Sequence, residues 1–276
     1  MSERLFLVLM LLGLSLSQRA NAQEAASSAA FLQNGVTAHR GNSIEFPENT
    51  MAAFQSAIEL GADWIELDLF LTRDGKIVVI HDKSTARVGD RALMVGESTY
   101  DQLLAVDVAS DFRKRHHKSL DECPPAKIPL LEDVLRLVGT QAKTRVSLQP
   151  KVDCVAEAVA IVQKLKMERQ AGFNDGNLQF MIEAKRRAPE VTIFWDRGPE
   201  TDLDKDIAIA REHQFHALVL RHDGVTEVKI QKIKDAGLEA GAWTVNDPKV
   251  MQKLHNWGVQ RIYTDDPRTL LRLISR

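Results

Sequence analysis

Short runs of apolar residues alternate with amphipathic segments along the chain from Val36 onward. The apolar runs are rich in β-branched residues and predict strands, whereas the apolar spacing of the segments between them predicts helices. Strands are expected at Val36–His39, Trp64–Phe70, Lys76–His81, Arg145–Leu148, Gln170–Phe173, Val191–Trp195, Ala217–Leu220, Glu239–Val245 and Arg261–Thr264. Helices are expected at Thr50–Leu60, Leu130–Val138, Val155–Lys166, Asn177–Arg187, Asp204–His213, Thr226–Ala236 and Pro248–Trp257. Strand-then-helix order indicates a parallel α/β sheet.

The connections between these elements distinguish an open sheet from a closed barrel. Leu71 to Gly75 is too short for a crossover helix, and Asp74-Gly75 is a hairpin signal, so one of the nine strands is a hairpin partner. No glycine-rich dinucleotide-binding turn follows an early strand. Polar residues instead end several strands, which is where a TIM barrel carries its active site. We predict a somewhat distorted TIM (β/α)8 barrel with a long insertion at about residues 87–127, a candidate lid.

The N-terminal segment resembles a targeting signal. Leu5 to Leu16 is apolar but short for a membrane span, and Ala20-Asn21-Ala22 has the small-residue pattern of a cleavage site. We therefore expect a signal peptide at 1–22, a leader at 23–35 and one catalytic domain at 36–276. Cleavage after Ala22 would give a secreted or periplasmic protein without a stable membrane anchor; an uncleaved anchor is the alternative.

Charge and cysteine content limit the possible binding partners and metal sites. The 276 residues carry a net charge of −2, so no basic face for a nucleic-acid partner is indicated. The two cysteines, Cys123 and Cys154, are no zinc signature. In an oxidising compartment they could form a disulfide, or they could be two unpaired small residues. The oligomeric state cannot be read from the sequence.

Candidate chemistry lies at the predicted strand ends. His39-Arg40-Gly41 ends the first strand, and His81-Asp82 ends the third. Histidine exchanges protons near neutral pH, and the arginine fork suits a phosphate. A lone histidine at a strand end is more often structural, and Asp82 could orient His81 or merely terminate its strand. Lys151 could neutralise charge on a phosphate, or could be a solvated lysine.

The second strand carries Glu66-Leu67-Asp68. Residues two apart in a strand share a face, so both carboxylates point to one place. Burying two negative charges together is costly without a cation, and paired carboxylate oxygens suit Mg²⁺ or Ca²⁺. The alternative is a solvated polar face. Glu48, just before the first helix, could additionally brace the site.

Taken together, these motifs resemble the glycerophosphodiester phosphodiesterase family. The resemblance runs from about Val36 to the C-terminus, and it is most specific from Thr37 to Asp82. The matching blocks are His39-Arg40-Gly41, Pro47-Glu48-Asn49-Thr50, Ala53-Phe54, Gly61-Ala62-Asp63, Glu66-x-Asp68, Thr72-x-Asp74-Gly75, His81-Asp82, Ile128-Pro129-x-Leu131-Glu132, Trp243-Thr244-Val245-Asn246 and Thr264-Asp265-x-Pro267.

The resemblance implies metal-dependent hydrolysis of a glycerophosphodiester to glycerol 3-phosphate and an alcohol. It implies that His39 and His81 are the general acid and base. It implies one divalent cation, Mg²⁺ or Ca²⁺. The implied substrate is a small molecule.

The resemblance also assigns the binding residues. Glu66 and Asp68 would hold the cation with a third carboxylate from a later strand. The residues expected at the phosphate are Arg40 and Lys151, and Trp243 would line the glycerol side.

The chain departs from the family at the third ligand, where Gln149-Pro150-Lys151 replaces Glu-x-Lys. A glutamine oxygen still suits a hard cation, but one negative charge is lost and affinity should fall. Glu183-Ala184-Lys185 matches the pattern but lies within a predicted helix. Two other functions therefore stay open, a related lipid phosphodiesterase of phospholipase type and a degenerate phosphodiester-binding protein of weak activity.

Overall fold

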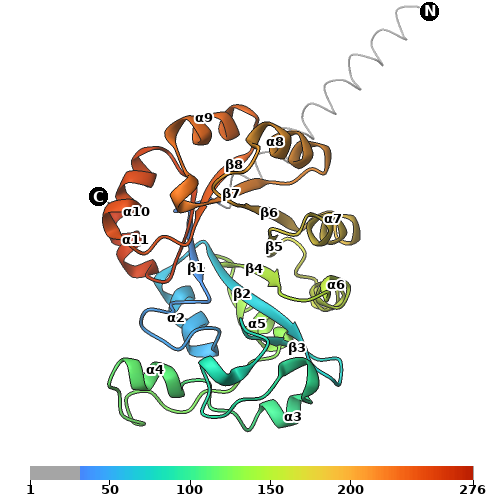
Figure 1. The fold of residues 1–276 in the computed structure, drawn as a ribbon, viewed down its shortest axis with the longest axis vertical. Helices are drawn as coiled ribbons and strands as arrows, with labels where there is room; N and C mark the ends of the chain where they lie inside the picture. The colour runs from blue at the N-terminus through green and yellow to red at the C-terminus, as the bar shows by residue number, and fades with distance from the viewer. Residues whose placement is uncertain (1–31, 276) are drawn as a thin grey trace, which may run out of the picture. The chain divides into compact units, whose positions relative to one another are not determined.

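The computed structural model describes residues 32–275, and their centre is a closed barrel of eight parallel strands. Strand β1 pairs with both β2 and β9, which closes the sheet on itself. Figure 1 shows the helices arranged around these strands. The strands are β1 (Val36–His39), β2 (Trp64–Leu71), β4 (Arg145–Pro150), β5 (Ala171–Asp175), β6 (Thr192–Arg197), β7 (Ala217–Arg221), β8 (Glu239–Trp243) and β9 (Arg261–Thr264). The predicted TIM barrel is confirmed.

The ninth strand is the predicted hairpin partner. Strand β3 (Ile77–Val79) runs antiparallel to β2, with Leu69 opposite Val79 and Leu71 opposite Ile77. The turn closes with Gly75 at a φ of 74°, a backbone conformation that glycine adopts without strain. The hairpin extends β2 past the barrel rim and carries the chain to His81.

The helices around the barrel match the prediction to within a few residues, and one of them, the last, is new. They are α2 (Met51–Leu60), α5 (Leu131–Val138), α6 (Val155–Lys164), α7 (Leu178–Arg187), α8 (Leu203–Glu212), α9 (Glu227–Asp235), α10 (Pro248–Asn256) and α11 (Pro267–Ile274). Helix α11 is absent from the sequence prediction. Its start was nevertheless readable, because Asp266 caps the helix by accepting from the Thr269 amide and Pro267 occupies the first turn.

Two apolar layers hold the barrel together. The larger lies between the strands and the surrounding helices. A smaller cluster inside the barrel contains Trp64, Phe194 and Tyr263, and the buried Arg261 guanidinium lies 4.4 Å from the centre of the Phe194 ring. Because this cluster fills the barrel interior, the space for chemistry is at the carboxyl ends of the strands.

The long insertion is more ordered than its polar sequence indicates. It contains η1 (Thr85–Arg87), η2 (Val95–Glu97), α3 (Tyr100–Leu103) and α4 (Ser110–Arg115). Its apolar residues, including Val95 and Leu103, form a separate cluster with Phe70 and Val78 of the hairpin. Figure 1 shows α3 and α4 at the lower end of the view, on the side of β3 and α2. The insertion is therefore packed against the strands that carry the predicted site.

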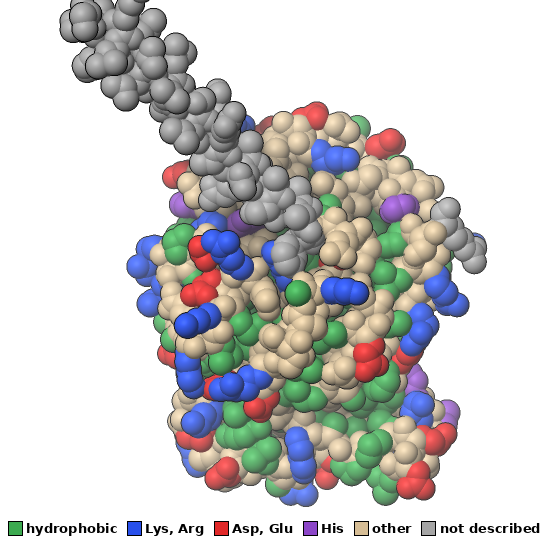
Figure 2. Space-filling view, turned by 180° about the vertical axis from the view of Figure 1, so that it is seen from behind, with side chains coloured by type: hydrophobic (Ala, Val, Ile, Leu, Met, Phe, Trp, Pro, Cys, Tyr) green, Lys and Arg blue, Asp and Glu red, His purple; other side chains and the backbone are tan. Residues whose placement is uncertain are grey.

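Several expectations concern the ends and the cysteines. The predicted signal peptide at 1–22 and most of the leader at 23–35 lie outside the described residues. Cys123 and Cys154 are both buried and unbridged, and they belong to different apolar clusters, so the disulfide alternative is wrong. Among residues 32–275, no helix is long and apolar enough to cross a membrane. On the face in Figure 2, both acidic and basic side chains lie on the surface.

Candidate active site

The sheet register brings the predicted ligands together at one rim. In the barrel, His39 on β1 pairs with Glu66 on β2, and Asp68 on β2 pairs with Gln149 on β4. Paired residues of parallel strands project to the same side of the sheet, so side chains far apart in sequence converge. The site thus follows from barrel closure plus the alternation of side chains along each strand.

His39 is held by a carboxylate from the far end of the chain. Its Nδ1 donates to Asp265 Oδ1 at 2.7 Å, and its Nε2 lies 4.0 Å from Glu66 Oε2. Burial lowers the pKa of His39, but the Asp265 hydrogen bond and the Glu66 charge outweigh it, so this pKa lies above its ordinary value. Asp265 in turn accepts from Ser43 and Asn246. The sequence prediction included Asp265 in a motif but not among the site residues.

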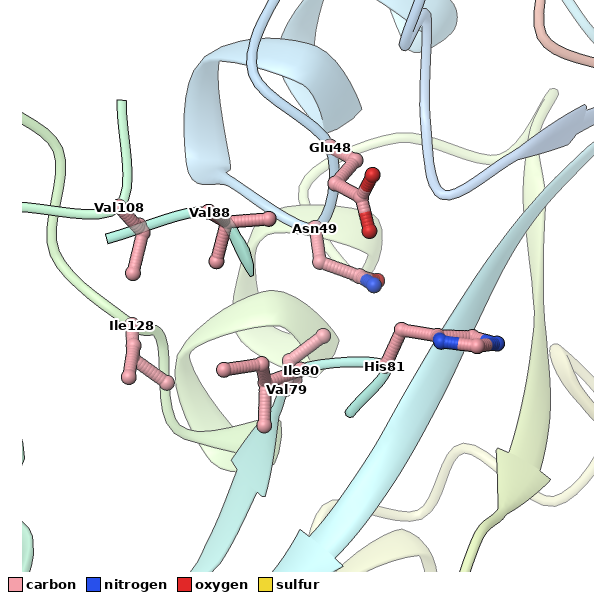
Figure 3. Close-up of a pocket in the computed structure, with 8 residues that line it drawn as sticks. All are labelled: Glu48, Asn49, Val79, Ile80, His81, Val88, Val108 and Ile128. Atoms are coloured by element: carbon pink, nitrogen blue, oxygen red, sulfur yellow. The ribbon is translucent and has the colours of Figure 1, made fainter. Parts of the chain in front are cut away.

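His81 follows the hairpin and has its own carboxylate. Its Nδ1 lies 2.6 Å from Asp82 Oδ1, so Asp82 orients the ring as well as following the strand. Burial lowers the pKa of His81 below its ordinary value, despite the nearby Asp68 charge. In Figure 3 the His81 ring extends toward the same side as the Glu48 and Asn49 side chains. On the opposite side, apolar side chains line the small pocket, namely Val79, Ile80, Val88, Val108 and Ile128.

The two carboxylates of β2 are fully enclosed. Glu66 is 1% exposed and Asp68 is 0% exposed. Burial and the neighbouring Asp68 charge raise the pKa of Glu66 to about 7. Burial would also raise the pKa of Asp68, but the Lys151 and Arg40 charges lower it below its ordinary value. The structure therefore concentrates negative charge at one buried point, rather than on a solvated face.

Two positively charged side chains flank Asp68. Arg40 Nε lies 3.3 Å from Asp68 Oδ2, and Lys151 Nζ lies 3.0 Å from Asp68 Oδ1. The Arg40 backbone amide also donates to Glu66 at 3.1 Å, from a residue with a φ of 58°. Lys151 is therefore an ion-paired residue of the rim instead of a solvated lysine. The Arg40 and Lys151 side chains both lie beside the buried carboxylates, where the two of them could bind a phosphate.

Residues before α2 and in the insertion brace this arrangement. Glu48 Oε1 accepts from Arg40 Nη1 at 2.9 Å and from Arg87 Nη2 at 2.7 Å. Arg87 also donates to Asp82, the partner of His81. Asn49 donates to Asp68 at 2.7 Å. Arg87 and Asn49 were not among the predicted site residues: Asn49 stood only in a matching motif, and nothing local in the sequence marks Arg87.

Gln149 and Trp243 occupy the same rim. Gln149 Oε1 accepts from Lys151 Nζ, and Gln149 Nε2 donates to Asp196 on β6 at 3.2 Å. Trp243 ends β8 and packs against the apolar cluster inside the barrel. By contrast, Glu183 and Lys185 lie on helix α7, away from the strand ends, as the helical pattern predicts.

The oxygen atoms at this rim fit a hard cation. Asp68 Oδ1 is buried and makes no hydrogen bond. The Lys151 ammonium contacts both Asp68 Oδ1 and Gln149 Oε1, so these two oxygens face one positive charge. Carboxylate and amide oxygens are the ligands that Mg²⁺ and Ca²⁺ prefer. Within residues 32–275 no group of three His, Cys, Asp or Glu side chains that could hold a metal ion is present.

Proteins of similar sequence and fold are known. A relative named glycerophosphodiester phosphodiesterase from Caldanaerobacter subterraneus subsp. tengcongensis is 29% identical over 250 residues, covering 87% of this chain and 98% of that protein. Another with the same name, from Bacillus altitudinis, is 27% identical over 248 residues, covering 86% of this chain and 97% of that protein.

Solved structures show the same barrel. A phosphodiesterase from Oleispira antarctica, solved with the product sn-glycerol-3-phosphate, superposes with a TM-score of 0.75 at 24% identity, covering 87% of this chain and 96% of that one. A glycerophosphodiester phosphodiesterase from Agrobacterium tumefaciens gives 0.72 at 23% identity, covering 88% and 100%. The model of the glycerophosphoryl diester phosphodiesterase family matches residues 39–269, a span that runs from His39 past Asp265. The chain therefore belongs to the glycerophosphoryl diester phosphodiesterase family and is a phosphodiester hydrolase.

Proposed function

We propose that this enzyme hydrolyses glycerophosphodiesters to glycerol 3-phosphate and an alcohol, with one divalent cation, Mg²⁺ or Ca²⁺, at Glu66, Asp68 and Gln149. The observation that carries the proposal is the pair of histidines, each oriented by an aspartate, beside two buried carboxylates. His39 is held by Asp265 and His81 by Asp82, in both cases through Nδ1.

This arrangement supports acid–base cleavage of a diester. Because Nδ1 of each histidine faces its aspartate, Nε2 is left for the substrate. One histidine would deprotonate the nucleophile, and the other would protonate the leaving alcohol. With water as the nucleophile the product is glycerol 3-phosphate directly, whereas attack by the glycerol 2-hydroxyl would give a cyclic phosphate that water then opens to glycerol 3-phosphate. Arg40 and Lys151 would hold the phosphate. The bound cation would neutralise charge on the phosphate oxygens.

The glycerol end of the substrate is supported by two observations. The structure of the Oleispira antarctica phosphodiesterase contains sn-glycerol-3-phosphate as product. In this chain Trp243 presents a partly exposed indole at the end of β8, at the same rim as the histidines. An aromatic face beside a polar site can cover the carbon backbone of glycerol and exclude water from it.

A direct assay tests the proposal. Mature protein, treated with a chelator and then dialysed, is incubated with glycerophosphocholine, and glycerol 3-phosphate is measured by an enzyme-coupled assay. We expect no release without cation and recovery when Mg²⁺ or Ca²⁺ is added. Full activity in excess chelator would refute the cation. Cleavage of a lysophospholipid in preference to glycerophosphocholine would favour the lipid phosphodiesterase, and no cleavage with either cation would favour the degenerate protein.

A further inference from the structure

A chain of buried polar side chains crosses the barrel interior behind the predicted cation ligands. Ser147 Oγ donates to Asn174 Oδ1 at 2.7 Å, and Asn174 Nδ2 donates to Asp196 Oδ2 at 3.2 Å. Asp196 Oδ2 also accepts from Gln149 Nε2 at 3.2 Å. The side chains come from three neighbouring strands, β4, β5 and β6. None of these contacts involves the two histidines.

Asp196 is the unusual member of this chain of contacts. It is 8% exposed, and its Oδ1 is buried without a hydrogen-bond partner. A buried carboxylate is costly unless it is compensated, so its retention at this position calls for a reason. Nothing in the acid–base scheme uses Asp196.

The neighbours of Gln149 allow only one orientation of its amide. Lys151 has only donors, and Asp196 Oδ2 acts as an acceptor in this network, since it also accepts from Asn174 Nδ2. The amide nitrogen of Gln149 must therefore face Asp196, and its carbonyl oxygen must face Lys151. The opposite orientation would put two donors together on one side and two acceptors together on the other. Asp196 thus selects the orientation in which Gln149 offers an oxygen toward Asp68.

The same contact places a carboxyl group directly behind the glutamine. A glutamate at position 149 would supply a third carboxylate beside Glu66 and Asp68. In this chain the third carboxylate stands on β6, one hydrogen bond behind the amide oxygen. An anion that accepts from the amide nitrogen also makes the amide oxygen a stronger donor to a cation, as partners of metal ligands commonly do.

We propose that Asp196 is a positioning residue that orients and polarises Gln149, so that the Gln149 carbonyl oxygen serves as the third cation ligand. This inference rests on the cation of the proposed function. It assigns to Gln149 and Asp196 jointly the role that one glutamate would otherwise have.

Isothermal titration calorimetry of the chelator-treated mature protein with MgCl₂ and with CaCl₂ tests the proposal without reference to activity. Asp196→Asn is nearly isosteric, and we expect it to weaken cation binding by roughly 10- to 100-fold. The double variant Gln149→Glu/Asp196→Asn moves the carboxylate to the ligand position and should bind at least as tightly as the parent. Asp175→Asn is the control, because Asp175 ends β5 at the same rim but accepts from the Asn177 amide.

The outcomes separate this inference from the function on which it rests. Cation binding by Asp196→Asn within about threefold of the parent would overturn the role of Asp196. Equal weakening by Asp175→Asn would show that only the overall charge matters, which also overturns it. If Asp196→Asn does not fold, the double variant decides, since weak binding by that protein would contradict the charge relocation. If the parent itself binds neither cation, the cation of the proposed function fails instead.

Discussion

Replacing Asp265 by asparagine should lower kcat by roughly two to four orders of magnitude while leaving the barrel folded. Asp265 Oδ1 accepts from His39 at 2.7 Å and from Ser43 at 3.1 Å, and Oδ2 accepts from Asn246 at 2.6 Å. A carboxylate satisfies all three donors, whereas an amide has one oxygen. Whichever way the introduced amide points, its NH₂ group opposes a donor from His39 or from Asn246.

The magnitude follows from those contacts. A hydrogen bond to a charged partner is worth about 1.5–3 kcal/mol, which corresponds to a factor of roughly 10 to 100. A histidine that loses its aspartate can also adopt the wrong tautomer, and in Ser-His-Asp enzymes that change costs about 10⁴ in kcat. The pKa of His39 should fall as well, because Asp265 raises it through both its hydrogen bond and its charge.

Steady-state kinetics on glycerophosphocholine and a histidine-selective NMR titration measure the two effects. The matched control is Asp266→Asn, which removes the same charge one residue along. Asp266 caps α11 through the Thr269 amide, and asparagine caps a helix equally well. A kcat for Asp265→Asn within about threefold of the parent, or an equal loss in Asp266→Asn, would refute the reasoning.

Three further predictions concern stability and processing. Burial lowers the pKa of His216 to about 4, and its Nδ1 accepts from the Ile193 amide, so protonation is favoured in the unfolded chain. The stability conferred by neutral His216 should be complete above about pH 6.5 and lost as pH falls toward about 4. At pH 5 the free energy of unfolding should be lower by about 2 kcal/mol. Urea unfolding of the parent should show this loss, and the loss should be smaller in His216→Asn. Gly41→Ala should destabilise the fold by at least about 1 kcal/mol in the same assay, because φ is 82° and a Cβ would meet the Ala53 backbone at 2.7 Å; an unchanged midpoint would contradict this. Mass spectrometry of the exported protein should find Gln23 at its N-terminus, and an intact Met1 on membrane-bound protein would favour the anchor.

Most of the fold could be predicted because its signals are local. The strands of a closed parallel barrel are buried on both sides, so they appear as apolar runs such as Ala217 to Leu220, separated by periodic helices. The Asp74-Gly75 turn likewise identifies the hairpin from a short stretch of sequence. Helix α11 was missed although its cap signal is present, because its eight residues follow β9 closely. The insertion was harder, since its short helices are stabilised by packing against the hairpin instead of by their own pattern.

The candidate site also contains residues with local sequence signals and residues without them. His39 ends β1, Glu66 and Asp68 share one face of β2, and His81 follows β3, so position relative to a strand marks each of them. Asp265 escaped because it reaches His39 only after 226 residues, through closure of β1 against β9. A sequence motif such as Thr264-Asp265 can flag the segment, but the partner of each side chain is set by barrel register.

Asp196 shows the limit more clearly. It follows an ordinary apolar strand, Ile193 to Trp195, and no neighbour in sequence hints at a role. Its significance arises from Gln149, a departure that the sequence comparison does reveal. The sequence thus identified Gln149 as the position that lacks a carboxylate, whereas Asp196 could be recognised only from its contacts in the structure.

The most direct test of the central claim is the turnover of two single variants, His39→Ala and His81→Ala, on glycerophosphocholine with saturating cation. His222→Ala is the control, since His222 is an exposed histidine in η3 (His222–Gly224), just past the end of β7. If these histidines are the acid and base, each variant should lose roughly 10²- to 10⁴-fold in kcat while the control keeps the parent value. Parent-level turnover by either His39→Ala or His81→Ala would contradict the account.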